Sequence, residues 1–173
     1  RFALMHIDDD TLNHRDDVKK TTELPLAHKW ILSRTNQTIK DVRAAMKGYH
    51  FNEIASANYQ FIWHEFCDWY LEWIKADLFS NDENLQKQAK AILLTVLETI
   101  LKLIHPVTPF VTEEIWSVLP GERKPLMLTE FPEPLDSWDN KEAEEEARLL
   151  MGIVTGIRNI RSESEVHPSA KID

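Results

Sequence analysis

The chain has 173 residues, of which 43% are hydrophobic and 28% charged, and this composition is typical of one soluble globular domain with at most a small appendage. A net charge of −9 argues against a nucleic-acid partner unless the cations gather on one surface. Four glycines are too few for a phosphate-cradling loop or an all-β fold. The single cysteine, Cys67, excludes an internal disulfide and fits a reducing compartment. No apolar run reaches the ~18 residues that predict a membrane span.

The N-terminal part predicts a helix end and then a connector. Residues 1–6, RFALMH, contain an apolar run and carry no start signal, so we expect the end of a helix that begins outside the chain. A charged connector over about residues 8–22 should follow. Pro25 suits the start of a second helix, Leu26–Lys47, and Gly48 is its expected stop.

This second helix gathers positive charge. Between His28 and Gly48 the helix has several Lys and Arg residues, and Asp41 is the only acidic residue. Such a stripe is either a solvated face or a phosphate-contacting face, and the pattern alone favours the solvated face. The stripe consists of Lys29, Asn36, Lys40, Arg43 and Lys47, and Arg34 adds a further positive charge to the same helix.

The segment Asn52–Lys75 has neither Gly nor Pro and is rich in Trp and Tyr. Its apolar residues recur at three- and four-residue intervals, which predicts one broad apolar arc on a helix. We therefore expect the central helix of a bundle. The predicted arc is Ile54, Ala55, Tyr59, Ile62, Trp63, Phe66, Trp69, Tyr70, Trp73 and Ile74.

Three more helices are predicted after a turn near Asp82. The first covers Leu85–His105 and ends at Pro106, and a short one runs from Pro109 to about Leu119. The last covers about Lys141–Arg161. Its apolar residues are expected to face inward; they are Leu149, Leu150, Ile153, Ile157 and Ile160.

Residues 120–138 are expected to form a small appendage. Within it, Leu126–Phe131 alternates in polarity between prolines and is the one strand candidate. Residues 162–173 are expected to form a tail.

The chain carries no strong catalytic pattern. Neither Gly-rich phosphate motif occurs. His64 and Asp68 lie one helical turn apart, but a second His at metal-ligand spacing is missing, so we expect no metal site there. Catalytic residues are not predicted anywhere in this chain.

Four blocks of sequence are specific in combination. They are LPLAHKWILSR at 24–34, FCDWYLE at 66–72, HPVTPFVTEEIW at 105–116 and IRNIRSESEVHP at 157–168. Together they closely resemble the anticodon-binding region of valyl-tRNA synthetases, which are class I aminoacyl-tRNA synthetases. The third block is shared with the isoleucyl and leucyl enzymes, whereas the second and fourth look valyl. The resemblance covers essentially the whole chain.

The resemblance implies an all-α anticodon-binding helical bundle over residues 1–161, and a tail that leads to a coiled coil absent here. The HIGH and KMSKS signatures of the catalytic domain are also absent, so we expect a non-catalytic module of the parent ligase. That parent would be a cytoplasmic enzyme of protein biosynthesis, which joins valine to tRNA with ATP and Mg²⁺. The module would need no cofactor of its own and no membrane.

The implied partners are the anticodon stem-loop of tRNA-Val and, in cis, the rest of a monomeric synthetase. Two surfaces could contact phosphates: the basic stripe, and a pair formed by Arg158 and Arg161. Trp30, Arg34 and Gln37 border the stripe and could supply a stacking plane and hydrogen bonds to unpaired bases. Trp30 is equally well explained as a core residue. The rival functions are the equivalent isoleucyl or leucyl domain, a metal enzyme, and a helical protein-interaction scaffold that uses the acidic segment 142–146.

Overall fold

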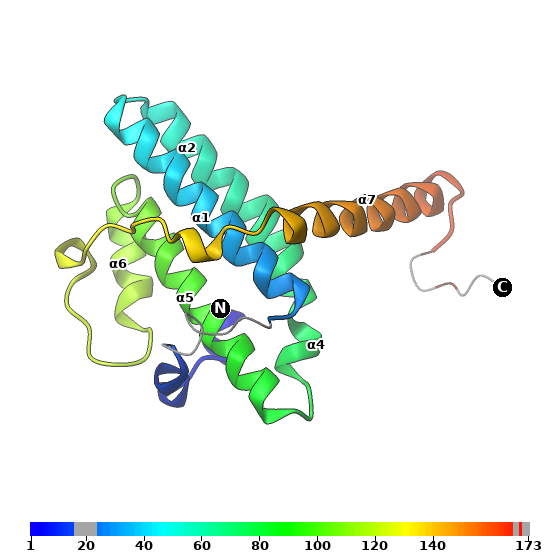
Figure 1. The fold of residues 1–173 in the computed structure, drawn as a ribbon, viewed down its shortest axis with the longest axis horizontal. Helices are drawn as coiled ribbons and strands as arrows, with labels where there is room; N and C mark the ends of the chain where they lie inside the picture. Colours follow the sequence, from blue (N-terminus) through cyan, green and yellow to red (C-terminus); the bar gives the residue numbers. More distant parts are fainter. Residues whose placement is uncertain (16–23, 168–169, 171–173) are drawn as a thin grey trace.

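The computed structural model describes residues 1–15, 24–167 and 170, and among these residues it contains helices and no strand. The prediction of an all-α bundle is confirmed. Figure 1 shows α1 and α2 as a projecting hairpin, α5 and α6 on the other side of α1, and α7 leading away from the bundle. In chain order the elements are η1 (Ala3–Met5), η2 (Asp9–His14), α1 (Leu26–Lys47), α2 (Phe51–Tyr59), η4 (Gln60–Tyr70), α3 (Leu71–Trp73), α4 (Lys75–Leu78), α5 (Glu83–Ile104), α6 (Pro109–Ser117), η5 (Leu126–Leu128), η6 (Asp136–Trp138) and α7 (Lys141–Glu163).

Helix α1 occupies the centre of the bundle, in place of the aromatic segment that the sequence suggested. It contacts α2, η4, α5, η6 and α7 (Figure 1). Its buried residues include Ile31 and Val42, which are fully covered, and also several polar side chains. A central helix with polar side chains inside must find hydrogen-bond partners for them on its neighbours.

The segment η4 is a π-helix, and this changes which side chains face the core. The buried residues of η4 are Phe61, Phe66 and Tyr70, and the five-residue step between the first two matches the wider π-helical turn. The predicted arc is wrong at two rings: Tyr59, at the end of α2, and Trp63, in η4, are 59% and 55% exposed. Phe66 is buried, as predicted.

The predicted strand at Leu126–Phe131 is wrong. Leu126–Leu128 forms a single 3-10 turn. The backbone groups of this region bond to α6: the Leu126 amide donates to the Glu113 carboxylate at 2.9 Å, and the Trp116 indole donates to the Lys124 carbonyl at 3.0 Å. An isolated alternating segment has no ladder partner, so contacts with a helix decide its conformation.

The buried residues of helix α7, Ala143 and Ala147, lie in its first half. The prediction that the apolar residues of this helix face inward is wrong. Figure 1 shows the second half of α7 leading away from the bundle. Leu149, Leu150, Ile153, Ile157 and Ile160 are 64%, 41%, 51%, 53% and 65% exposed.

At the N-terminus, Ala3–Met5 forms one 3-10 turn where a helix end was expected. The predicted connector contains a second 3-10 helix, which starts with a capping box between Asp8 and Thr11. Its remainder lies outside the described residues, as do residues 168, 169 and 171–173 of the predicted tail. The described helices include none with the length and hydropathy of a membrane span.

Candidate nucleic-acid interface

The basic stripe on α1 contacts neighbouring segments of the chain. Lys40 Nζ lies 2.6 Å from Asp139 Oδ2, and Arg43 pairs with Glu133 at 2.7 Å while it donates to the Pro132 carbonyl at 3.0 Å. The hydrogen bond from Lys40 lowers the pKa of Asp139 below its usual range. These two cations therefore hold the chain before α7 across α1 and carry little unbalanced charge.

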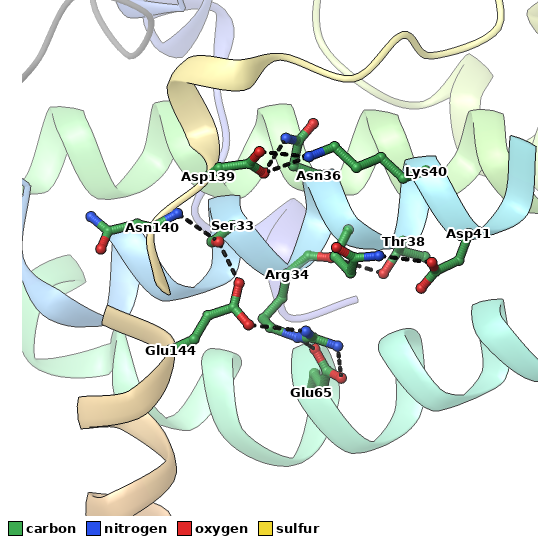
Figure 2. Close-up of polar contacts among 11 residues, drawn as sticks. Ser33, Arg34, Asn36, Thr38, Lys40, Asp41, Glu65, Asp139, Asn140 and Glu144 are labelled. Atoms are coloured by element: carbon green, nitrogen blue, oxygen red, sulfur yellow. Dashed lines mark hydrogen bonds and ion pairs between the residues drawn. The ribbon is translucent and has the colours of Figure 1, made fainter. Parts of the chain in front are cut away.

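Arg34 joins three helices. Its Nε and Nη2 donate to the two oxygens of Glu65 at 2.8 and 3.1 Å, and its Nη1 donates to Glu144 at 3.2 Å (Figure 2). The hydrogen bond to Glu65, with support from Glu144, raises the pKa of Arg34 above its usual range. A guanidinium bound by two carboxylates connects α1 to η4 and α7.

Two uncharged side chains of α1 complete this connection. Asn36 exchanges hydrogen bonds with the backbone of Leu135, at 2.9 Å to its carbonyl and 2.7 Å from its amide. Ser33 accepts from the Asn140 amide at 2.9 Å and donates to Glu144 at 2.5 Å (Figure 2). Sequence analysis missed these residues, and the available signal was the run of polar side chains on the buried side of α1.

The other predicted base-reading residues are also engaged. Trp30 is 2% exposed, with its ring centroid 5.8 Å from that of Trp73, so the core alternative describes it. Gln37 donates to Asp41 on the same helix at 2.8 Å. Lys29 and Lys47 form no ion pair within the described part of the chain, and Lys47 is exposed at the end of α1.

The arginine pair of α7 lies apart from the stripe. The exposed Arg158 places its guanidinium over the Trp69 ring, 5.6 Å from the centroid. Arg161 donates to the carbonyls of His167 and Ala170 at 2.7 and 2.9 Å, so it holds the chain that follows α7. The structure therefore does not bring the two predicted phosphate surfaces together.

The α1–α2 hairpin and the start of η4 expose aromatic rings, two of which, Tyr59 and Trp63, belong to the predicted apolar arc. Tyr49 and Phe51 at the hairpin turn are 78% and 72% exposed. Further along, Tyr59 and Trp63 stack nearly parallel, with centroids 6.2 Å apart and an interplanar angle of 4°. Exposed flat rings of this kind are the surfaces on which proteins stack unpaired bases. The sequence signal that could have predicted this exposure is the number of aromatic residues in the segment, which exceeds what one side of a helix can bury.

His64 is one turn from Asp68 as predicted, with Nδ1 3.3 Å from Oδ2. Groups of three or more side chains suited to a metal ion do not occur among the described residues.

Comparisons with known proteins agree with the resemblance seen in the four sequence blocks. The family described as the anticodon-binding domain of tRNA ligase matches residues 28–173. The chain is 61% identical over its full 173 residues to a valine–tRNA ligase of Desulfotalea psychrophila, and this alignment covers 20% of that protein. It is 38% identical to the valine–tRNA ligase of Oceanobacillus iheyensis and 40% identical to that of Geobacter sulfurreducens, in each case over 99% of this chain and 19% of the relative.

The chain thus spans about a fifth of the length of the curated relatives it matches. The family match covers most of the chain and includes the helices from α1 to α7. The chain belongs to the family of anticodon-binding domains of tRNA ligases.

Proposed function

We propose that this chain binds the anticodon arm of tRNA-Val on behalf of a valine–tRNA ligase of which it is one part. One observation carries the proposal: a chain that matches the anticodon-binding family aligns from end to end with a single segment of valine–tRNA ligases, at 61% identity. The ligase would attach valine to tRNA with ATP and Mg²⁺ in a separate catalytic domain. This chain contributes binding energy and discrimination between tRNAs, and needs no cofactor.

The chemistry of the surface supports this function. Single-stranded RNA loops are bound by stacking of bases on flat side chains and by cations that neutralise phosphates. The exposed rings of α2 and η4, with Tyr59 and Trp63 as a parallel pair, supply the stacking surface. Lys29, Lys47 and Arg158 are the predicted cations that no carboxylate neutralises within the described chain, and we assign them to phosphates.

Three of the predicted contact residues have a supporting role in this proposal. Arg34, Lys40 and Arg43 bind carboxylates from η4, from the segment before α7, and from α7 itself. They fix the hairpin relative to the rest of the bundle, which presents its exposed rings on a rigid support. A preformed surface loses less entropy on binding than a mobile one.

The rest of the parent ligase is the second proposed partner. The apolar residues on the second half of α7 are exposed, and a patch of this kind usually marks a protein contact. A separate scaffold function that uses the acidic residues 142–146 is less favoured, because Glu144 already binds Ser33 and Arg34.

The test is a titration of the chain with tRNA-Val and with the same tRNA carrying a changed anticodon, each at several salt concentrations. We expect affinity to fall with salt, by about 0.7 in log–log slope for each neutralised phosphate of a single strand. We expect the changed anticodon to weaken binding by about 1–3 kcal/mol for each base that the chain no longer recognises. An affinity that ignores both salt and anticodon would contradict the proposal.

A further inference from the structure

The turn between α1 and α2 contains a tyrosine in a backbone conformation that favours glycine. Tyr49 has a φ of 56°. Its amide donates to the Met46 carbonyl at 3.2 Å, and the His50 amide donates to the Ala45 carbonyl at 2.9 Å. These two bonds form a Schellman motif, in which the left-handed residue is usually glycine because a Cβ is disfavoured there.

The glycine of this turn, Gly48, is one residue before Tyr49, and its role is different. Gly48 has a φ of −86°, which any residue adopts. A Cβ on Gly48 would lie 3.0 Å from the His50 ring, so Gly48 provides room for that ring. The sequence expectation that Gly48 ends the helix is correct in position, but the left-handed residue is Tyr49.

The Tyr49 side chain makes no visible contribution to the fold. It is 78% exposed, and its ring and hydroxyl have no hydrogen-bond or ring partner in the described part of the chain. A large residue in an unfavourable conformation, with no internal contact, points to a role outside the fold.

The surroundings of Tyr49 fit a nucleobase. Phe51, two residues on, is 72% exposed, and the exposed Lys47 precedes the turn. Figure 1 shows that the turn is the outer end of the α1–α2 hairpin, a projecting tip rather than a groove or a flat face. A projecting tip with flat rings and a lysine suits the bases and phosphates of an RNA loop, whereas a protein partner would bury a broader apolar face.

We propose that Tyr49 stacks on an unpaired nucleobase of the RNA that this chain binds, with Lys47 near an adjacent phosphate. This inference rests on the proposed function and locates part of its binding surface at the hairpin tip, where Tyr49 adds a base contact to Lys47 of the predicted stripe.

The experiment compares Tyr49→Gly and Tyr49→Phe with the wild-type chain, for affinity toward an anticodon stem-loop hairpin and for the thermal unfolding midpoint. Because glycine is favoured at a positive φ, we expect Tyr49→Gly to unfold at or above the wild-type temperature. We expect its RNA affinity to fall about 5- to 100-fold, the range that removal of one base–aromatic stack produces. Tyr49→Phe keeps the ring and should bind within about twofold of wild type.

A matched control is available at the other end of the chain. Glu165 has a φ of 53°, and its amide and the next donate to the Ser162 and Arg161 carbonyls at 3.1 and 2.9 Å, so it occupies the same left-handed position after α7. Glu165→Gly should relieve the backbone in the same way without weakening RNA binding. Phe79→Leu controls for the loss of any exposed ring, because Phe79 lies between α4 and α5, away from the tip (Figure 1).

The readout of stacking itself is the fluorescence of 2-aminopurine placed at each loop position of the hairpin in turn. We expect one position to be quenched by the wild-type chain and by Tyr49→Phe but not by Tyr49→Gly. If wild type binds the hairpin and Tyr49→Gly binds equally well, the inference is overturned while the proposed function stands. If wild type fails to bind the hairpin, the proposed function fails, and the inference with it.

Discussion

Arg34 has partners inside the chain that its sequence position did not suggest. Its position at the border of a basic stripe suggested a contact with bases. In the folded chain its guanidinium binds Glu65 and Glu144, which are distant in sequence. A cluster of cations along one helix predicts that these side chains bind anionic groups. It does not predict whether the anionic group is a phosphate or a carboxylate of the same chain.

Replacement of Arg34 tests this internal role. In Arg34→Ala the Glu65 carboxylate, whose side chain is 15% exposed, would lose its bidentate partner. We expect a loss of about 1–3 kcal/mol in the free energy of unfolding, the usual cost of a covered polar group left without its partner. Urea unfolding measures this loss. Lys87→Ala is the control, since Lys87 and Glu83 form an exposed pair 3.8 Å apart on one helix, and it should change stability by less than about 0.5 kcal/mol. Equal midpoints for Arg34→Ala and Lys87→Ala would contradict the role of Arg34.

The ion pair of Asp139 should make the free energy of unfolding depend on pH. Hydrogen bonds from Lys40 and Asn36 lower its pKa in the folded chain. A carboxylate with a lowered folded pKa stabilises the fold above its unfolded pKa, near 3.8, and this contribution is lost as pH falls through the folded value. We expect the urea midpoint of Asp139→Asn to fall less steeply than that of wild type as pH drops below about 4. Parallel curves for the two proteins would contradict this.

At the scale of elements, the aromatic segment shows what periodicity can and cannot predict. The absence of Gly and Pro correctly predicted helical structure throughout Asn52–Lys75 apart from a break at Ile74. Its inward side could not be predicted, because a π-helical stretch shifts the register by about one residue per turn. Local sequence does not encode that shift; it depends on how η4 packs against α1.

Two substitutions three residues apart, at Trp63 and Phe66, test the register of η4. Phe66 is 5% exposed within the main core, so Phe66→Ala should cost about 3–5 kcal/mol. Trp63 is 55% exposed, so Trp63→Ala should change stability by less than about 0.5–1 kcal/mol, despite the larger side chain. Both values come from urea unfolding followed by circular dichroism. A loss for Trp63→Ala as large as that for Phe66→Ala would contradict the observed register and favour the regular α-helical arc, in which both side chains face the core.

The failures at Leu126–Phe131 and in α7 have a common cause. In each case the order of apolar and polar residues was read correctly, but that order does not show which element, if any, packs against the apolar side. The alternating segment has no strand to pair with in the described chain, and the apolar residues on the second half of α7 stay largely exposed there. Type and length of helices follow from local chemistry, whereas partners of a surface follow from the whole fold.

At the scale of the whole molecule, the distribution of charge decides where RNA can bind. The chain has a net charge of −9, and much of the α1 stripe is neutralised by carboxylates. The sequence resemblance predicted the family and the helical fold, but it did not locate the binding surface among the cations. Lys47 alone combines exposure, an unpaired charge within the described chain, and proximity to the exposed rings of the hairpin turn.

Lys47 therefore gives a prediction for the salt dependence of binding. Lys47→Ala should reduce the log–log salt slope by about 0.7, the contribution of one phosphate contact on a single strand, and should weaken matched and mismatched tRNAs alike. Lys87→Ala removes the same charge at the start of α5 and should leave the slope unchanged. Equal slopes for the two variants would place the phosphate contacts elsewhere, most directly at Arg158.

The central claim is that this chain binds the anticodon arm rather than tRNA in general. The most direct measurement is the Kd of the chain for an isolated tRNA-Val anticodon stem-loop, compared at one salt concentration with that for a hairpin of equal length made from the acceptor stem. We expect the stem-loop to bind at least about tenfold more tightly, a difference of about 1.4 kcal/mol, as expected for one or more base contacts. Equal affinity for the two hairpins, or tighter binding of the acceptor hairpin, would contradict the claim.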